Sequence, residues 1–263
     1  MELNKIYNES CMDTISKMSN GTIDLVITSP PYNMTKRKGG YGDSGRYDMY
    51  VDFKNEGDYI KDTIDLFNAF DRIVRSQGVV LYNFNYSIEN PSLPYKLVSD
   101  IVRNTNWDVV DTICWKKRCG LPFPANKYRL SRNWEFVWVF VRKDRMNDFF
   151  IDKQVSSTSD KTGQTYYNVW YNFIEAANND AQTRKLNQAT FSSEFVSKLL
   201  DMYCPKAGGV VYDPFFGTGT TAVACINNPK HPQWIGSEIS TNQCDYAQER
   251  INKEIQKQKQ SLF

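Results

Sequence analysis

The sequence predicts an α/β fold built on a mainly parallel sheet, and two observations support this prediction. Short runs rich in β-branched residues alternate along the chain with segments whose apolar residues recur at helical spacing. Such alternation is typical of βαβ units, in which helices cover the faces of a parallel sheet. The chain has 263 residues, of which 41% are hydrophobic, so it can bury the core of one large domain.

The first half of the chain contains the clearest of these elements. Residues 23–28 read IDLVIT, a β-branched run expected to form a buried parallel strand. Residues 11–18 and 58–75 have apolar faces at helical spacing, and we expect Gly78 to end the second helix. The next predicted elements are a strand at 79–82, a helix at 97–105, and strands at 109–115 and 136–141.

The second half continues the alternation after one interruption. Residues 144–185 are polar and show no sustained period, so we expect an inserted lobe or long excursion rather than sheet. Residues 192–203 predict a helix capped by Ser192 or Ser193, with Glu194 in its first turn. The remaining predictions are strands at 210–212 and 233–239 and helices at 220–226 and 246–258.

Composition narrows the classes of function. The six cysteines form no C-x-x-C pair, and the single histidine, His231, lies in a proline-flanked stretch expected to be a surface loop, so we expect no metal site. The chain opens without a signal-like segment, and its longest apolar run, at 136–141, is too short to cross a bilayer. We therefore expect a cytoplasmic protein with no membrane partner. The net charge of +2 means that any anionic partner must be inferred from local charge.

A glycine-containing turn follows the predicted strand at 210–212. Gly217 and Gly219 stand between this strand and a helix, where glycine lets the backbone approach a ligand closely. No lysine follows Gly219, which excludes a phosphate-binding P-loop, and the turn alone is more typical of a tight connection than of a cofactor loop. Glu238 ends the next strand, where an acid in a Rossmann-like sheet accepts hydrogen bonds from ribose hydroxyls. Together these features favour a nucleoside-containing cofactor.

A second motif, Thr-Ser-Pro-Pro-Tyr-Asn, follows the strand at 23–28. Ser29 stands where the chain leaves the sheet, at the edge where open α/β sheets bind ligands. Pro30 and Pro31 fix the backbone and have no N–H, and Tyr32 offers a flat ring for stacking. By itself this segment is compatible with either a rigid turn or a ligand site.

Taken together, Asp213–Thr221 and Ser29–Tyr32 resemble the cofactor and catalytic motifs of the DNA amino-methyltransferase family, which methylates N4 of cytosine or N6 of adenine. Because the catalytic motif comes first, the chain resembles the permuted β group. The resemblance implies a Rossmann-like S-adenosylmethionine-dependent methyltransferase fold with a seven-stranded, mainly parallel sheet and an inserted target-recognition lobe. It divides the chain into a catalytic half (1–143), a target-recognition region (144–185) and a cofactor-binding half (186–263).

The resemblance also implies roles for particular residues. Ser29 Oγ and the Pro30 carbonyl would accept hydrogen bonds from the target amine, and Tyr32 would stack on the flipped base. Serine in the first position favours N4 of cytosine, with N6 of adenine as the alternative. The residues expected to hold S-adenosyl-L-methionine are Thr28, Asp213, Phe215, Gly217, Gly219, Thr220, Thr221 and Glu238.

Two further segments are expected near the cofactor. By resemblance, the segment from Asn8 to Cys11 stands where the family has a cofactor-facing segment. Asn187 and Phe191 occupy the place of a His-Pro segment that many relatives have, and both are candidates for cofactor contact.

Local charge supports double-stranded DNA as the partner. Residues 112–134 contain basic and aromatic side chains but no acid, a pattern suited to a nucleic-acid groove. The predicted DNA-binding residues are Lys36, Arg37, Lys38, Lys116, Lys117, Arg118, Lys127, Arg129 and Arg132.

Several points stay open at this stage. The resemblance is compatible with a homodimer, a cognate restriction endonuclease and association with the nucleoid. The alternative functions are methylation of another acceptor, such as a protein amide or an RNA base, and an inactive DNA-binding subunit. The order of the motifs and Ser29 count against the first alternative, and the intact motifs count against the second.

Overall fold

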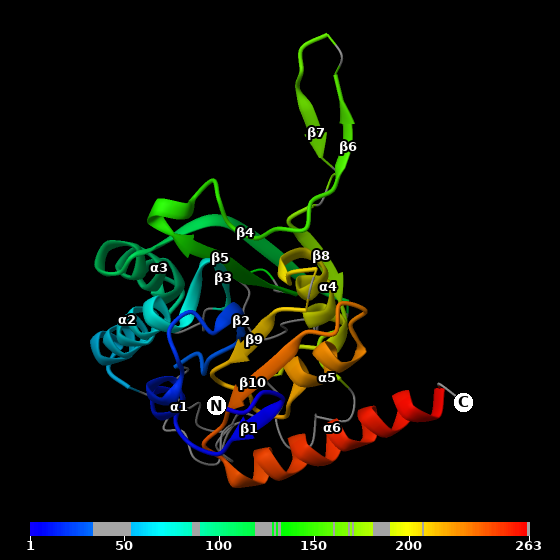
Figure 1. Ribbon diagram of the computed structural model, residues 1–263. Coiled ribbons are helices and arrows are strands. Elements are labelled where there is room, and N and C mark those ends of the chain that lie inside the picture. Colours follow the sequence, from blue (N-terminus) through cyan, green and yellow to red (C-terminus); the bar gives the residue numbers. More distant parts are fainter. Residues whose placement is uncertain are drawn as a thin grey trace.

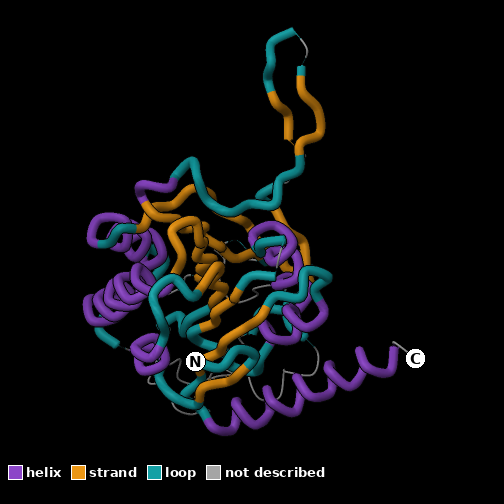
Figure 2. The backbone as a smooth tube through the Cα atoms, viewed as in Figure 1, coloured by secondary structure: helices purple, strands orange, loops and turns teal. Residues whose placement is uncertain are grey.

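The computed structural model describes residues 1–33, 54–85, 90–118, 128, 130, 133–159, 161–167, 169, 171–180, 190–206 and 208–261. Helices and strands alternate along this part of the chain (Figures 1 and 2). The helices are α1 (Cys11–Lys17), α2 (Glu56–Ile73), α3 (Leu93–Asn104), the 3-10 turn η1 (Lys143–Arg145), α4 (Ser193–Tyr203), α5 (Thr220–Asn227) and α6 (Thr241–Ser261). The strands are β1 (Lys5–Tyr7), β2 (Ile23–Thr28), β3 (Val74–Phe84), β4 (Trp107–Lys117), β5 (Trp134–Arg142), β6 (Val155–Thr158), β7 (Thr165–Tyr167), β8 (Phe173–Ala176), β9 (Val210–Asp213) and β10 (Gln233–Ser237).

One large sheet organises the fold, with the strand order β1-β10-β9-β2-β3-β5-β4-β8. The first five strands in this order run parallel, β5 is antiparallel to both β3 and β4, and β8 is parallel to β4. The predicted α/β class and mainly parallel sheet are confirmed, but the described residues supply eight strands to this sheet rather than seven. The three residues of β1 are too few to show a period in the sequence, so no strand was expected there.

Helices cover both faces of the sheet. Helices α1, α2 and α3 lie on one face, and α4, α5 and α6 lie on the other (Figure 1). Strand β5 shows how the sequence builds both cores, because alternate side chains of a strand point to opposite faces. Val137 and Val139 join the core beneath α4 and α5, while Trp138 and Phe140 join the core beneath α2 and α3.

Most local predictions agree with the structure, but the prediction at Gly78 is wrong. Helix α4 begins as predicted, with the Ser192 hydroxyl accepting a hydrogen bond from the Phe195 N–H at 3.3 Å. Gly78 does not end α2, because α2 ends at Ile73 and β3 begins at the next residue, Val74. The helix gives way to the strand through the extended backbone of Val74, without any glycine or proline that the sequence could have shown.

The prediction that residues 144–185 contain no sheet is wrong for three short segments. Strands β6 and β7 pair as an antiparallel hairpin that projects away from the rest of the molecule (Figures 1 and 2). Strand β8 joins the edge of the large sheet beside β4. In β8 the side chains of Ile174 and Ala176 are buried and those of Phe173 and Glu175 are exposed, an alternation too short to stand out in a polar region.

Residues 34–53 lie outside the described part of the chain, and α2 begins shortly after them, at Glu56. Among the helices of the described ranges, none combines the length and the apolar character that crossing a membrane requires.

Candidate active site

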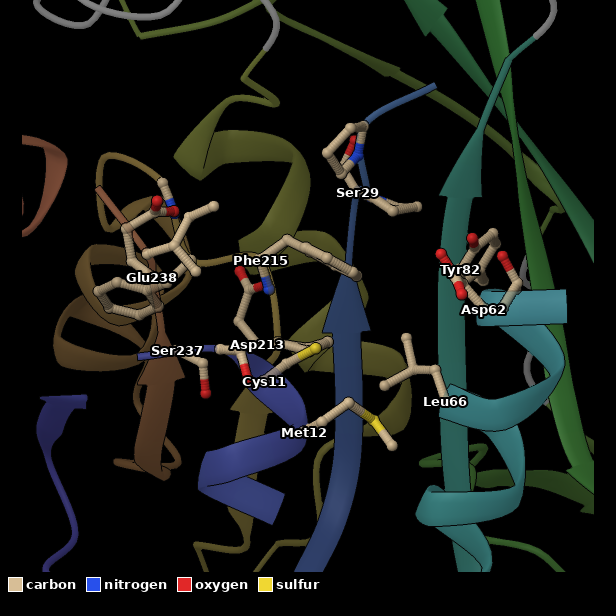
Figure 3. Close-up of a pocket in the computed structure, with 18 of the residues that line it drawn as sticks. Cys11, Met12, Ser29, Asp62, Leu66, Tyr82, Asp213, Phe215, Ser237 and Glu238 are labelled. Atoms are coloured by element: carbon tan, nitrogen blue, oxygen red, sulfur yellow. The ribbon is translucent and has the colours of Figure 1, made fainter. Parts of the chain in front are cut away.

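A cavity of about 420 Å³ opens at the carboxyl ends of the central strands. Figure 3 shows Asp213 at the end of β9, Phe215 after it and Glu238 after β10 on one side, Tyr82 from β3 on the other, and Ser29 at the end of β2 between them. Open α/β sheets bind ligands at this edge, because the loops that leave parallel strands converge there.

Asp213 ends β9 at the cofactor side of the cavity and is almost completely buried. Its carboxylate accepts hydrogen bonds from the Thr221 hydroxyl at 2.5 Å and the Phe215 N–H at 3.1 Å. Burial raises the pKa of Asp213 to about 7, because removing the carboxylate from water disfavours its charge, and the nearby Glu238 adds repulsion. The hydrogen bonds oppose this rise in pKa without cancelling it.

The glycine turn between β9 and α5 has the backbone that the sequence predicted. Gly217 and Gly219 have φ values of 52° and 78°, in the left-handed region that favours glycine. A Cβ at Gly219 would also lie 3.0 Å from the Cβ of Ala247 in α6, so the turn packs closely against that helix. The Gly217 N–H donates a hydrogen bond to Glu238 Oε2 at 2.8 Å, which joins the turn to the end of β10.

Glu238 lies where an acid that binds a ribose was predicted, directly after β10. Besides the bond from Gly217, its Oε1 accepts a hydrogen bond from the Ser240 N–H at 2.8 Å. The Asn8 side-chain amide donates to the Glu238 carbonyl at 2.8 Å, so the N-terminal segment is fixed to the same strand end.

The N-terminal segment around the start of α1 also reaches the cavity. Glu9, Ser10, Cys11 and Met12 line it beside Ser237, in keeping with the expectation for this segment. Burial raises the pKa of the Cys11 thiol to about 11, so the thiol is protonated near neutral pH and is a poor nucleophile.

The predicted cofactor residues divide into two groups. Asp213, Phe215, Gly217 and Glu238 line the cavity. The other predicted cofactor residues are buried behind this wall: Thr28, Gly219, Thr220 and Thr221. In the structure, therefore, these four support the residues that line the cavity. Phe191 lines the cavity, whereas Asn187 lies outside the described residues.

Sequence reasoning missed Arg250, which supports the glycine turn from α6. Its guanidinium donates hydrogen bonds to the Thr218 carbonyl at 3.2 Å and to the Thr220 hydroxyl at 3.0 Å, and it forms an ion pair with Asp180. Arg250 is 6% exposed, next to the buried Ile251. The sequence contains one signal for this role, since Arg250 stands beside the apolar stripe of a predicted helix. Buried arginines are almost always paired, so an arginine at such a position indicates a partner within the protein.

The predicted catalytic segment lies at the end of β2. Ser29, Pro30 and Pro31 line the cavity. The Pro31 carbonyl accepts a hydrogen bond from the Tyr59 hydroxyl at 2.6 Å, which ties the segment to α2. Tyr32 is not among the cavity-lining residues of the described chain.

Tyr32 is half-buried and contacts side chains of β3 and β5. Its ring packs against Phe84 with centroids 4.9 Å apart, and its hydroxyl lies 3.1 Å from Ser29 Oγ. The same hydroxyl lies 3.0 Å from both Asn83 Oδ1 and Glu135 Oε2. Asn83, in β3, and Glu135, in β5, were not recognised as site residues, because only the pairing of these strands brings them to Tyr32.

The predicted DNA-binding residues are partly described. Lys116, Lys117 and Arg118 form ion pairs with Glu175, Glu135 and Glu194, respectively. The run contains no acid in sequence, but β8, β5 and α4 each bring one to it. The other predicted DNA-binding residues lie outside the described residues: Lys36, Arg37, Lys38, Lys127, Arg129 and Arg132.

The described ranges contain no cluster of metal-binding side chains. No group of three or more histidine, cysteine or acidic side chains there could hold a metal ion. His231 is exposed in the loop between α5 and β10, as predicted for a surface loop.

The fold and the cavity define a Rossmann-like α/β protein with a cavity at the ends of β2, β9 and β10, the edge where such sheets bind ligands. The family model described as DNA methylase, which covers N6 and N4 amino-methyltransferases, matches residues 23–249, so the chain belongs to that family. The family therefore agrees with the resemblance of the two motifs.

Individual relatives are distant. The type II methyltransferase M.SmaI of Serratia marcescens is 24% identical over 94% of this chain and 90% of its own length. The type II methyltransferase M.MthZI of Methanothermobacter thermautotrophicus is 24% identical over 95% of this chain and 77% of its own.

Solved structures agree on the fold. The PvuII DNA methyltransferase, described as cytosine-N4-specific, has a TM-score of 0.70 at 16% identity and covers 97% of this chain and 92% of that chain. The complex of M1.HpyAVI with S-adenosylmethionine has a TM-score of 0.62 at 19% identity and covers 94% and 98%. Likeness at this level of identity establishes a shared fold.

Proposed function

We propose that the protein transfers a methyl group from S-adenosylmethionine to the N4 amine of cytosine in duplex DNA, after flipping the base out of the helix. The observation that carries the proposal is that Ser29 and Pro30 line the same cavity as Asp213 and Glu238. One cavity thus holds both acceptors for an amine and the acids expected to bind a nucleoside cofactor. Membership of the DNA methylase family supports DNA amino-methylation in general.

The residues of the cavity fit S-adenosylmethionine. The N–H groups of the turn at Gly217 and the carboxylate of Glu238 lie at the ends of the two strands that bind nucleosides in Rossmann-like sheets. The buried carboxyl of Asp213, with its pKa raised to about 7, would be favoured in its charged form by the positive charges of this cofactor. When bound, the cofactor supplies an electrophilic methyl group on a sulfonium.

The catalytic segment would position and polarise the target amine. This amine is conjugated with the base ring, so its lone pair is a poor nucleophile until the nitrogen becomes pyramidal. Ser29 Oγ and the Pro30 carbonyl would each accept one amine proton, which aims the lone pair out of the plane of the ring. The hydrogen bond from Tyr59 to the Pro31 carbonyl holds this segment in place, so little reorganisation is needed during the reaction.

The choice of cytosine over adenine rests on Ser29, whose hydroxyl stands where adenine-specific relatives mostly have aspartate. The cytosine-N4 specificity stated for the PvuII enzyme, which shares the fold, is compatible with it. We expect mass spectrometry of nucleosides from DNA treated with the protein and S-adenosylmethionine to detect N4-methylcytosine. Detection of N6-methyladenine without N4-methylcytosine would contradict this choice.

We also propose that Lys116 and Arg118 contact the DNA backbone. Their side chains are 39% and 54% exposed despite their ion pairs with Glu175 and Glu194. Surface ion pairs of this kind contribute only about 0–1 kcal/mol, so a phosphate can replace the carboxylate partner.

Replacing both Lys116 and Arg118 by glutamine is expected to weaken DNA binding and to flatten its dependence on salt. Each phosphate contact that is lost should reduce the slope of log K against log salt by about 0.9. Fluorescence anisotropy with a labelled duplex over a range of salt concentrations measures the slope. The matched control is Lys61→Gln, which removes an ion-paired lysine from the outer face of α2. A slope in the double variant equal to that of the wild type would argue against the contact.

We propose that residues 144–185 form the target-recognition region between a catalytic half (1–143) and a cofactor-binding half (186–263). The β6–β7 hairpin supports the proposal because it projects from the body of the protein (Figure 1). The hairpin and the segment after it expose Val155, Tyr167, Val169 and Tyr171, side chains that the core does not use.

Replacement of residues 155–167 by a short Gly-Ser linker is expected to reduce the sequence specificity of methylation while leaving cofactor binding intact. Each good base contact contributes about 1–3 kcal/mol of discrimination, so loss of the hairpin should reduce specificity by at least about tenfold. Methylation-aware sequencing of treated DNA and calorimetric titration with S-adenosylmethionine measure the two properties. An unchanged methylated motif would assign recognition to another part of the chain.

We also propose two partners and one cellular location for the protein. A second copy of the chain would form a homodimer, which sedimentation equilibrium detects, and a cognate restriction endonuclease would cleave the same sequence that the protein methylates. A DNA substrate would place the protein with the nucleoid in the cytoplasm.

A further inference from the structure

A chain of hydrogen bonds leads from Ser29 at the cavity wall into the protein. Ser29 Oγ lies 3.1 Å from the Tyr32 hydroxyl, which lies 3.0 Å from Glu135 Oε2 and 3.0 Å from Asn83 Oδ1. The other oxygen of Glu135 forms an ion pair with Lys117, and Glu135 itself is only 8% exposed. Four elements contribute to the chain: the loop after β2, and strands β3, β4 and β5.

The chemistry of these groups fixes the direction of the hydrogen bonds. The Asn83 amide donates through Nδ2 to the Phe136 carbonyl at 2.8 Å, so its Oδ1 faces Tyr32 as an acceptor. The Glu135 carboxylate, paired with Lys117, can only accept. Both partners of the phenol inside the protein are therefore acceptors, and the single Tyr32 proton is donated to them.

This direction determines the role of Ser29. Because the Tyr32 proton points inward, the Tyr32 oxygen must accept the hydrogen bond from Ser29 rather than donate it. The one hydroxyl proton of Ser29 is thus committed to Tyr32, which is its hydrogen-bond partner in the described part of the chain. The lone pairs of Ser29 are what this side chain presents to the cavity.

We propose that Glu135 is a positioning residue that acts through Tyr32 to make Ser29 an obligatory hydrogen-bond acceptor for the target amine. This inference rests on the proposed amino-methylation and deepens it. It assigns a function to Glu135 and Asn83. It also assigns the Tyr32 hydroxyl a function in addition to the base stacking expected of the Tyr32 ring.

The buried charge explains why a carboxylate suits this position. Hydrogen bonds to charged acceptors are roughly twice as strong as neutral ones, so Glu135 holds the Tyr32 proton firmly. Its negative charge lies two hydrogen bonds from Ser29 Oγ and would lie three from the amine, where it would stabilise the positive charge that the amine gains on methylation. Lys117 keeps the carboxylate paired while the lysine ammonium lies 4.8 Å from the Trp115 ring centroid. The negative charge of Glu135 would thereby act on the amine through the neutral hydroxyl of Ser29.

Three variants test the proposal: Glu135→Gln, Tyr32→Phe and the double variant. In Glu135→Gln the new amide oxygen must face Lys117, which only donates, so the amide N–H₂ faces Tyr32 and competes with Ser29 for the phenol oxygen. Tyr32→Phe retains the ring and removes only the hydroxyl.

We expect single-turnover methyl transfer to be about 10- to 100-fold slower in Glu135→Gln and at least as slow in Tyr32→Phe. Because Glu135 acts through Tyr32, the double variant should be no slower than Tyr32→Phe alone. Base flipping does not require the chain, so fluorescence of a duplex with 2-aminopurine at the target position, measured without cofactor, should match the wild type in all three variants.

The control is Glu56→Gln, because Glu56 also accepts hydrogen bonds from an asparagine and a lysine, Asn90 and Lys96, but lies outside the cavity. Its transfer rate should equal that of the wild type. A Glu135→Gln rate equal to that of the wild type, losses that multiply in the double variant, or altered base flipping would each overturn the inference and leave the proposed function standing. Failure of the wild-type protein to methylate any DNA would overturn both.

Discussion

Replacing Ser29 by alanine is expected to slow methyl transfer by about 10²- to 10³-fold, the cost seen when one preorganised hydrogen-bond partner of a transition state is removed. Ser29 lines the cavity with its hydroxyl proton committed to Tyr32, so its lone pairs would hold one amine proton of the flipped base. Alanine leaves that amine proton without a partner, and the nitrogen stays closer to planar. Single-turnover transfer of labelled methyl to duplex DNA measures the rate.

The same variant should bind both cofactor and DNA with little change. Ser29 acts on the reacting amine, so its loss should appear in the rate of the chemical step rather than in affinity. Ser16→Ala, which removes an exposed serine hydroxyl from the outer side of α1, is the matched control. A rate for Ser29→Ala within a factor of about two of the wild type would remove Ser29 from the catalytic machinery, since one good hydrogen bond contributes more than this.

Replacing Asp213 by asparagine is expected to change how the stability of the cofactor-free protein depends on pH. Burial raises the pKa of Asp213 from its ordinary value of 3.8 to about 7. Between these values the folded protein holds a proton that the unfolded chain has released. Its contribution to stability is therefore fully present below about pH 4 and is lost as the pH rises through about 7. The difference corresponds to about 4 kcal/mol.

Asparagine has no carboxyl to ionise, so this loss should disappear in the variant. Relative to the wild type, the free energy of unfolding of Asp213→Asn should increase, meaning greater stability, by about 4 kcal/mol between about pH 4 and about pH 8. Urea denaturation of both proteins without cofactor, at several pH values, measures this difference. Asp245→Asn, at an exposed position on α6, is the control. Parallel curves for Asp213→Asn and the wild type would contradict a raised pKa at Asp213.

The parts of the fold that the sequence predicts are those with strong local signals. Strand β2 matches its predicted range because IDLVIT is a run rich in β-branched residues before a proline pair. The start of α4 is predictable because a serine cap satisfies N–H groups that no other local group can reach. Strand β8 is not predictable, since its four residues become a strand only by pairing with the edge of β4.

The same distinction applies to the candidate site. Ser29 and Glu238 each follow a strand directly and Asp213 ends one, and parallel strands bring such positions to one edge of the sheet. The partners of Tyr32 depend on the antiparallel register of β3 and β5, where Asn83 lies opposite Val137, and no local pattern encodes that register.

The carboxylates that pair with the basic run illustrate the same limit. Glu175 comes from β8 and Glu194 from α4, both far along the chain from Lys116. Local charge counts describe a sequence window, whereas ion pairs depend on the tertiary fold.

The most direct test of the account is transfer of a labelled methyl group from S-adenosylmethionine to duplex DNA, followed by digestion to nucleosides and mass spectrometry of the labelled product. The account predicts that the label resides on an exocyclic amine, as N4-methylcytosine, and that Ser29→Ala reduces its amount by about 10²- to 10³-fold. Label on a ring carbon, as in 5-methylcytosine, or no label in any nucleoside would contradict it.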